Sequence, residues 1–312
     1  MSPPANVPPS TTDAAPAEVL RRLDLVITRR LDGMLHGEYQ GLVPGHGSEM
    51  GETRGYQPGD DVRRIDWNVT ARMQAPYVRE TIADRELEAW VLADLSPSLD
   101  FGTAFCEKRD LAISAIAAVG FLTNRTGNRI GAILVDPTTG ATTIPARGGR
   151  DHLMALLHRL VASKRAADGS TDLGAAMARL AATSRRRGLA VIVSDFLGPL
   201  DWELPLRRIT TTHETLCVEV VDPRELELPD MGVLRLVDPE SGELLEIQTS
   251  NTRLRERYAE AAAAQRAAIA AAFLRAGADH LQLRTDRDWL LDLVHFVAAR
   301  RDRIRNLRQV GS

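Results

Sequence analysis

From about residue 87 onward, the sequence alternates between apolar strand-like runs and segments with helical spacing of their apolar residues. The stretch 189–196, LAVIVSDF, shows the first pattern. It is almost continuously apolar, as a strand must be when both faces of its sheet are covered. Strands separated by helices pair in parallel, because the chain has to cross back over the sheet between them. We therefore predict an α/β fold with a mostly parallel central sheet and helices on both faces.

The element boundaries follow from the same patterns. Strands are expected at 90–93, 129–135, 141–145, 189–195, 214–221 and 280–284, and helices at 18–35, 104–124, 150–162, 172–186, 202–209, 252–275 and 288–307. A hairpin is expected at 233–237 and 244–248. We predict three segments: a disordered proline-rich tail at 1–17, an N-terminal helix and strand extension at 18–86, and the α/β domain at 87–309 with the hairpin inserted near 222–250.

Charge and composition exclude several classes of protein. The chain has 39 basic and 42 acidic residues, a balance that argues against binding nucleic acid or an anionic membrane as a whole. The uncharged run Leu111–Asn124 has 14 residues, whereas a membrane-spanning helix needs about 20. Cys106 and Cys217 lie too far apart in sequence to suggest a disulfide framework or a zinc cluster. We expect a cytoplasmic protein.

Common catalytic motifs are missing as well. The sequence has no GxxxxGK[ST] phosphate loop, no HExxH zinc motif and no GxSxG nucleophile elbow. His152 and His158 share a predicted helix but are six positions apart, so they do not face one ligand. These absences argue against P-loop nucleotide binding, zinc-protease and serine-hydrolase chemistry.

Five oxygen-bearing residues stand where strands end or helices begin. Asp94, Ser96 and Ser98 follow a buried strand, Thr171 precedes a helix, and Asp195 ends the strand in LAVIVSDF. In an open parallel sheet, ligands bind at the carboxyl ends of the strands, so these side chains could converge. Hydroxyl and carboxylate oxygens suit a hard cation such as Mg²⁺ or Mn²⁺. The alternative is that the hydroxyls only cap helices and the aspartates only end strands.

The five residues resemble the metal-ion-dependent adhesion site of von Willebrand factor type A domains, over residues 87–308. The resemblance implies that Ser96, Ser98 and Thr171 contact the ion, and that Asp94 and Asp195 bind it directly or through water. It also implies a von Willebrand factor A-like, Rossmann-type fold.

A second resemblance starts upstream, in RGYQPGDDVRRIDWNVTAR at 54–72. This stretch is similar to the hallmark R-x-Y-x-x-G-D-D-x-R-x-I-D-W of the bacterial domain-of-unknown-function family numbered fifty-eight. The matching residues are Arg54, Tyr56, Gly59, Asp60, Asp61, Arg63, Ile65, Asp66, Trp67, Ala71 and Arg72. Members commonly occur beside MoxR-type AAA+ ATPases, so the resemblance implies such an ATPase as a partner.

The hallmark segment has two interpretations. Its alternating charges could form an ion-pair network that fixes a loop on the domain. Alternatively it is a docking surface, because Arg, Tyr and Trp are the residues enriched at binding hot spots. The candidate docking residues are Arg54, Tyr56, Asp60, Asp61, Arg63, Asp66, Trp67 and Arg72.

A cation held largely by hydroxyls stays electrophilic and attracts a carboxylate from another molecule. We therefore expect a non-enzymatic, Mg²⁺-dependent adaptor or co-chaperone, acting with a MoxR-type ATPase on a client protein that the sequence does not identify. The partner would supply an acidic side chain at the metal. The first alternative is a metal-dependent phosphatase or hydrolase. Ser96, however, stands where a haloacid-dehalogenase-type phosphatase needs its second carboxylate. The second alternative is a structural protein whose metal site is never filled.

Overall fold

The computed structural model describes residues 4–35, 53–57, 62, 65–73, 75–79, 87–237 and 244–310. The chain forms two compact units, one of residues 1–44 and 87–312 and the other of residues 45–86. This division differs from the predicted one, which placed 18–35 in the extension. Helix α1 (Pro16–Leu35) belongs to the larger unit because Val19, Leu23 and Ile27 are buried in its core.

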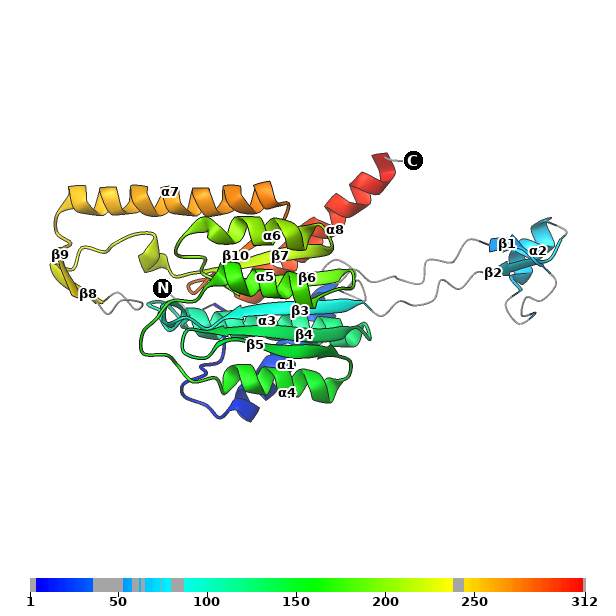
Figure 1. Ribbon diagram of the computed structural model, residues 1–312, viewed down its shortest axis with the longest axis horizontal. Helices are drawn as coiled ribbons and strands as arrows, with labels where there is room; N and C mark the ends of the chain where they lie inside the picture. Colours follow the sequence, from blue (N-terminus) through cyan, green and yellow to red (C-terminus); the bar gives the residue numbers. More distant parts are fainter. Residues whose placement is uncertain are drawn as a thin grey trace. The chain divides into compact units, whose positions relative to one another are not determined.

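The larger unit is built on a six-stranded sheet with the order β10-β7-β6-β3-β4-β5 (Figure 1). Its strands are β3 (Glu88–Asp94), β4 (Arg129–Asp136), β5 (Gly140–Arg147), β6 (Gly188–Ser194), β7 (His213–Val221) and β10 (Asp279–Arg284). All neighbours pair in parallel except β5, which is antiparallel to β4 at the edge. The predicted fold class is confirmed as a mostly parallel α/β sheet with helices on both faces.

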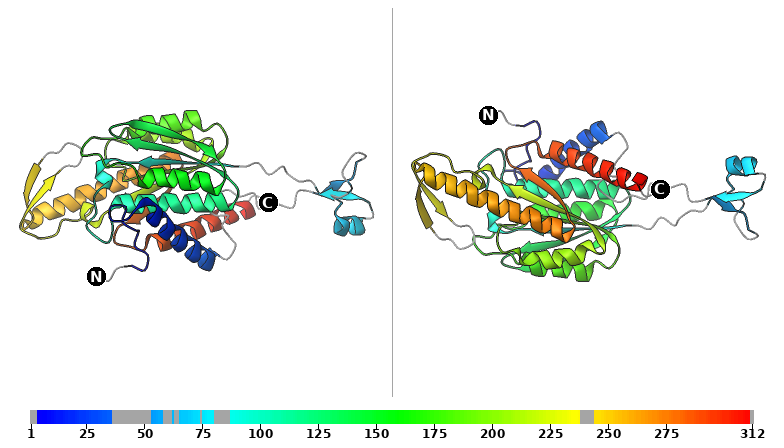
Figure 2. Two further views of the ribbon diagram at one scale, coloured as in Figure 1. Left: turned by 90° about the horizontal axis from the view of Figure 1, so that it is seen from below. Right: turned by 90° about the horizontal axis from the view of Figure 1, so that it is seen from above.

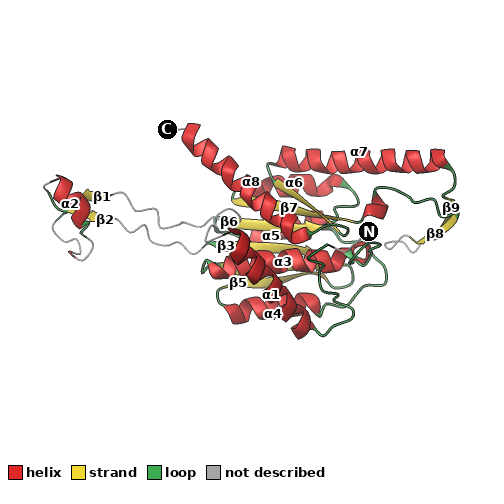
Figure 3. Ribbon diagram, turned by 180° about the vertical axis from the view of Figure 1, so that it is seen from behind, coloured by secondary structure: helices red, strands yellow, loops and turns green. Residues whose placement is uncertain are grey.

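Helices cover both faces of the sheet. One face carries α1, α3 (Lys108–Arg125), α4 (Arg150–Val161) and α8 (Trp289–Val310), several of which face the viewer in Figure 3. The opposite face carries α5 (Leu173–Thr183), α6 (Glu203–Thr210) and α7 (Thr252–Ala276). The division follows from strand periodicity, because alternate residues of each strand point to opposite faces.

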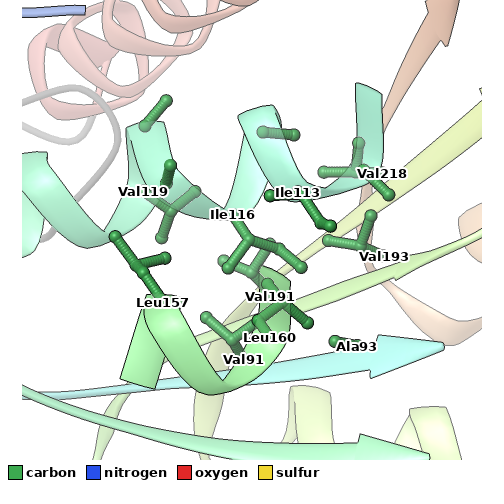
Figure 4. Close-up of a cluster of buried hydrophobic side chains, with 14 of the residues drawn as sticks. Val91, Ala93, Ile113, Ile116, Val119, Leu157, Leu160, Val191, Val193 and Val218 are labelled. Carbon is green, nitrogen blue, oxygen red and sulfur yellow. The ribbon is translucent and has the colours of Figure 1, made fainter. Parts of the chain in front are cut away.

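The core on the first face is centred on α3. Ile113, Ile116 and Val119 of this helix pack against valines of the sheet and leucines of α4 (Figure 4). Every residue from Lys108 to Thr123 is buried, which explains why the predicted run at 111–124 is uncharged. In the part of the chain that the structure describes, no helix is long and apolar enough to span a membrane.

The hairpin of β8 (Val233–Val237) and β9 (Leu244–Gln248) lies at the N-terminal end of α7, away from the sheet (Figure 2). Its strands have the predicted bounds, while most of its turn falls at 238–243, outside the described residues. The described part of this unit also contains the short 3-10 turns η3 (Pro97–Leu99), η4 (Leu200–Trp202) and η5 (Pro223–Glu225).

The proline-rich segment expected to be a disordered tail makes defined contacts from residue 4 onward. The Asn6 amide donates to both carboxylate oxygens of Asp288, at 2.9 and 2.7 Å. The hydroxyl of Thr11 donates to Asp110 Oδ1 at 2.6 Å. Polar side chains that pair with carboxylates of the larger unit therefore hold a segment that has no core of its own.

The smaller unit contains β1 (Thr53–Gly55), α2 (Trp67–Met73) and β2 (Tyr77–Arg79), with β1 antiparallel to β2. The sequence patterns did not predict α2. It begins after Asp66, whose Oδ1 accepts the backbone N–H groups of Asn68 and Val69 at 3.1 and 3.3 Å. An aspartate at this position satisfies amides that the first helical turn leaves without partners.

Candidate metal centre

The five predicted oxygen-bearing residues lie together at the carboxyl edge of the sheet. Asp94 is the last residue of β3, and Asp195 follows the last residue of the neighbouring strand β6. Because the two strands are parallel, both ends reach the same edge. Ser96 and Ser98 lie on the turn through η3, and Thr171 lies just before α5. Three loops thus bring their side chains to one place.

Asp94 accepts three hydrogen bonds through its carboxylate. Its Oδ1 accepts the Thr171 hydroxyl at 2.9 Å and the backbone N–H of Ser96 at 3.0 Å. Its Oδ2 accepts the hydroxyl of Ser194 at 2.6 Å. Asp94 is 4% exposed, so this carboxylate is fixed in a nearly dry environment. Ser194 was not among the predicted site residues, although it directly precedes Asp195.

The two serines connect Asp94 to Asp195. Ser96 Oγ and Ser98 Oγ are 3.0 Å apart, and Ser98 is hydrogen-bonded to the side chain of Asp195. Asp195 Oδ1 also accepts the backbone N–H of Leu197 at 3.1 Å. Ser96 is therefore tied to Asp94 by its backbone N–H and to Ser98 by its hydroxyl, while Thr171 and Ser98 each contact one of the two carboxylates.

The two carboxylates differ in their electrostatics. Burial, and then the nearby charge of Asp195, raise the pKa of Asp94 above its ordinary value, against the hydrogen bonds it accepts. Burial would also raise the pKa of Asp195, but the Lys108 ammonium outweighs it, and the pKa of Asp195 is lowered. Asp94 is thus a buried carboxylate beside a like charge, a situation that a bound cation would relieve.

Lys108 is a site residue that the sequence analysis did not identify. Its side chain is completely buried, and its Nζ donates to Asp195 Oδ2 at 2.8 Å and to Glu225 Oε1. Burial lowers the pKa of Lys108, but Asp195 and Glu225 raise it by more, so the ammonium stays charged. Composition could have drawn attention to it, because Lys108 and Lys164 are the only lysines in the sequence and the other Lys and Arg positions are all arginines.

Arg266 of α7 extends this ion-pair network. Its Nη1 donates to Glu219 Oε1 at 2.8 Å and to the Asp195 carbonyl at 3.0 Å. Its Nη2 donates to Glu225 Oε2 at 3.0 Å. Residues of α7, η5 and β7 therefore form an ion-pair network that includes the backbone carbonyl of Asp195.

The backbone after Asp195 is strained. Phe196 has a φ of 55°, in the left-handed region that disfavours residues with a Cβ. Its ring packs edge-on against Trp202 and Phe273, with centroids 5.4 and 4.8 Å away. Its backbone N–H donates to Ser194 Oγ at 3.0 Å. Aromatic packing holds this turn, and with it the orientation of Asp195.

A cavity of about 400 Å³ opens beside Thr171. Its lining includes Val135, Pro137, Ala141, Thr171, Ala176 and Arg179. Asp136 and Asp172 also line it. The Arg179 guanidinium donates from Nε to Thr143 Oγ1 at 3.0 Å. Of the five candidate metal ligands, Thr171 is the one that lines this cavity.

A family model described as Protein of unknown function DUF58 matches residues 52–268 of this chain. The chain belongs to this family. A relative, Uncharacterized protein Rv1480 of Mycobacterium tuberculosis, is 52% identical over 300 residues, covering 96% of this chain and 94% of that protein. An uncharacterised protein of Mycobacterium avium is 48% identical over 161 residues, covering 51% of this chain and 95% of that protein. The DUF58 resemblance of the hallmark segment is thereby confirmed.

Solved structures similar to this DUF58 protein are distant in sequence. BatB from Bacteroides thetaiotaomicron aligns with a TM-score of 0.44 and 12% identity, over 69% of this chain and 99% of that one. An aerotolerance-related membrane protein from Bacteroides fragilis aligns with a TM-score of 0.43 and 13% identity, over 70% and 99%. A von Willebrand factor type A structure from Catenulispora acidiphila aligns with a TM-score of 0.33 and 15% identity, over 46% and 34%.

The donor set of this DUF58 chain suits a hard cation. Among the described residues, no group of three or more His, Cys, Asp or Glu side chains is placed to hold a metal, so a cation at this edge would depend on hydroxyl oxygens as well as carboxylates. Three hydroxyls and two carboxylates meet instead, and these are ligands for Mg²⁺ or Mn²⁺. When bound, the ion would act as a Lewis acid toward an oxygen ligand. The site differs from a set of oxygen ligands alone, because the Lys108 ammonium already pairs with Asp195.

The hallmark segment of the smaller unit is only partly described. Asp60, Asp61 and Arg63 lie outside the described residues. Arg54 lies in β1 opposite Val78 of β2, and Tyr56 follows β1. Asp66 is buried and begins α2, whereas Trp67 is 71% exposed and Arg72 lies on the exposed surface of the same helix. The ion-pair and docking interpretations both stay open as predictions.

Proposed function

We propose that this protein is a non-enzymatic, Mg²⁺-dependent protein-interaction module. Three hydroxyls and two buried carboxylates converge at one sheet edge without a histidine or cysteine among them, and this observation carries the proposal. Ser96, Ser98, Thr171, Asp94 and Asp195 would hold Mg²⁺ or Mn²⁺. A Glu or Asp side chain from a partner protein would add its carboxylate to the ion.

The surrounding charges favour ligand binding over catalysis. A metal-dependent hydrolase needs a group that accepts or donates a proton near the reacting atoms. Lys108 is the buried cation nearest to Asp195, and its raised pKa keeps its proton in place at neutral pH. The residue two positions after Asp94 is a serine rather than an acid. No observation on this site favours the phosphatase alternative.

The partner in this proposal is a MoxR-type AAA+ ATPase, and the setting is the cytoplasm. The support is the hallmark segment of the DUF58 family, whose members commonly occur beside such ATPases. In this role the protein would help to activate or assemble a client complex. The exposed Trp67 of α2 offers a second contact, because a solvated tryptophan is a frequent binding hot spot.

Calorimetry with Mg²⁺ and a pull-down against a MoxR-type AAA+ ATPase from the same organism would test both parts. Asp94→Asn and Thr171→Val remove one carboxylate charge and one hydroxyl from the site. Asp168→Asn is the matched control, because Asp168 is exposed on the same loop as Thr171. We expect wild type and the control to bind the ATPase in Mg²⁺ and to release it in EDTA. Asp94→Asn should bind neither Mg²⁺ nor the ATPase, and Thr171→Val should bind Mg²⁺ on the order of tenfold more weakly than wild type. If Asp94→Asn still retained the ATPase in EDTA, the proposal that a metal ion links the two proteins would be wrong.

A further inference from the structure

The buried ion pair between Lys108 and Asp195 places a positive charge inside the candidate metal centre. The Nζ lies 2.8 Å from Asp195 Oδ2, and the exposed fractions of the two side chains are 0% and 3%. Water therefore does little to screen the pair. Any cation that uses Asp195 shares this carboxylate with an ammonium that is already there.

The charges around the centre leave room for one divalent ion. Four buried or nearly buried carboxylates belong to this network: Lys108 joins Asp195 to Glu225, Arg266 joins Glu225 to Glu219, and Asp94 lies beside Asp195. His280, which contacts Glu219, is counted as neutral. The carboxylates face two basic side chains, Lys108 and Arg266. With all of these groups ionised, the cluster keeps an excess of two negative charges, which a single Mg²⁺ or Mn²⁺ would neutralise. Without Lys108 the excess would be three.

Lys108 also changes what the ion offers to another molecule. A carboxylate whose charge is matched by an ammonium donates less electron density to a metal, so the metal keeps more of its own charge. A partner carboxylate then meets a neutral cluster when Lys108 is present. It would meet a negative cluster if Lys108 were removed, and like charges repel.

We propose that Lys108 is a specificity-determining residue of this centre: it weakens binding of the metal alone and keeps the bound metal attractive to an incoming carboxylate. The inference rests on the proposed metal-dependent function. The lysine should therefore have opposite effects on two binding equilibria. It weakens binding of the metal cation, and it strengthens binding of a carboxylate to the metal-loaded protein. A lysine that only filled space in the core would have no such opposite effects.

The test compares Mn²⁺ affinities of the full-length protein by calorimetry. Lys108→Met removes the charge and keeps the length of the side chain. Glu225→Gln removes the other partner of Lys108, which leaves the ammonium to Asp195 alone. We expect Lys108→Met to bind Mn²⁺ on the order of ten- to a hundredfold more tightly than wild type, and Glu225→Gln to bind about tenfold more weakly. A merely structural lysine would weaken binding in both variants.

The double variant Lys108→Met/Glu225→Gln covers the case in which Lys108→Met does not fold. Removing Lys108 from the wild-type protein leaves the buried Glu225 carboxylate without its ammonium partner. In the Glu225→Gln background this carboxylate is absent, so the lysine can be removed without that cost. The same gain in Mn²⁺ affinity is expected when the double variant is compared with Glu225→Gln alone. Equal or weaker binding after removal of the lysine, in whichever background folds, overturns the proposal.

A second measurement uses acetate as the carboxylate probe on the Mn²⁺-loaded proteins, followed by the relaxation rate of water protons. Acetate that displaces water from Mn²⁺ lowers this rate. We expect Lys108→Met to need about tenfold more acetate than wild type, and an unchanged requirement would overturn the second half of the proposal. If wild type bound no Mn²⁺ while Lys108→Met did, the proposed function would fail, and with it the half of the inference that concerns the incoming carboxylate; the half that concerns metal affinity would stand. Absence of Mn²⁺ binding in both would overturn both.

Discussion

The hydroxyl of Thr171 lies 2.9 Å from Asp94 Oδ1, although the two residues are 77 positions apart in the chain. One follows a central strand and the other precedes α5, so their contact depends on the complete sheet edge. The hydroxyl donates its hydrogen to the carboxylate in the arrangement described here. A cation between them would accept a lone pair from each oxygen instead, which makes this contact a direct probe of metal binding.

Replacing Thr171 with valine should weaken Mg²⁺ binding by on the order of tenfold, because it keeps the side-chain shape and removes one oxygen. Thr171→Ser restores the hydroxyl and should retain nearly normal affinity. Isothermal titration of both variants measures the difference. Thr183→Val is the matched control, since its hydroxyl donates to the Arg179 carbonyl within α5 and lies outside the centre. Equal Mg²⁺ affinity for Thr171→Val and wild type would remove Thr171 from the ligand set.

Phe196 should be one of the side chains that contribute most to stability. It is completely buried against Trp202 and Phe273, and replacing a buried phenylalanine with alanine destabilises a protein by about 3–5 kcal/mol. Because φ of Phe196 is 55°, Phe196→Gly should be about 1 kcal/mol more stable than Phe196→Ala despite the smaller side chain. Urea denaturation measures both. The control is Leu274→Ala, at a side chain that is 81% exposed, and a reversed order of the Gly and Ala variants would contradict the argument from strain.

The sheet and its helices were predictable because their signals are local. Strands such as β6 are continuously apolar, and the bounds of β8 and β9 match the predicted hairpin. Helix α2 was missed because it is short and none of its residues is described as buried, so no apolar stripe marks it. The grouping of α1 with the larger unit depends on which surface its apolar face meets, and periodicity alone does not specify that.

The sequence predicted the five oxygen-bearing residues of the candidate site but not the charged residues that surround them. Asp94, Thr171 and Asp195 could be placed at one edge because parallel strands end together. Lys108 could not, because it lies at the start of a helix on a different segment, and only the fold brings its Nζ to Asp195. The same holds for Glu225 and Arg266, which belong to η5 and α7. When each element contributes one charged residue to a network, the sequence contains no repeated spacing from which the network could be predicted.

Both cysteines should be unreactive in the native protein. Burial, and then the negative charges of Asp110 and Asp222, raise the pKa of the Cys106 thiol to about 12. Burial raises the pKa of Cys217 well above its ordinary value. Because the thiolate is the reactive form, neither residue should react quickly with Ellman's reagent at pH 8. Two thiols should react at once after unfolding in guanidinium chloride. A fast-reacting thiol in the native protein would show that the surroundings of that cysteine are more open than described.

Glu219 should make stability depend on pH. Burial acts to raise its pKa, but the hydrogen bond from His280 and the charge of Arg266 outweigh burial, and its pKa lies below the ordinary value of 4.5. Ionised Glu219 therefore stabilises the fold above pH 4.5, and this contribution is lost as the pH falls through the lowered pKa. Glu219→Gln should reduce the free energy of unfolding by about 3 kcal/mol at pH 7. The difference from wild type should shrink below pH 4.5, because a protonated glutamate resembles glutamine. Urea denaturation at several pH values tests this, with Glu246→Gln on the exposed ion pair to Arg235 as the control; a difference that stays constant with pH would mean that Glu219 acts through packing and not through its charge.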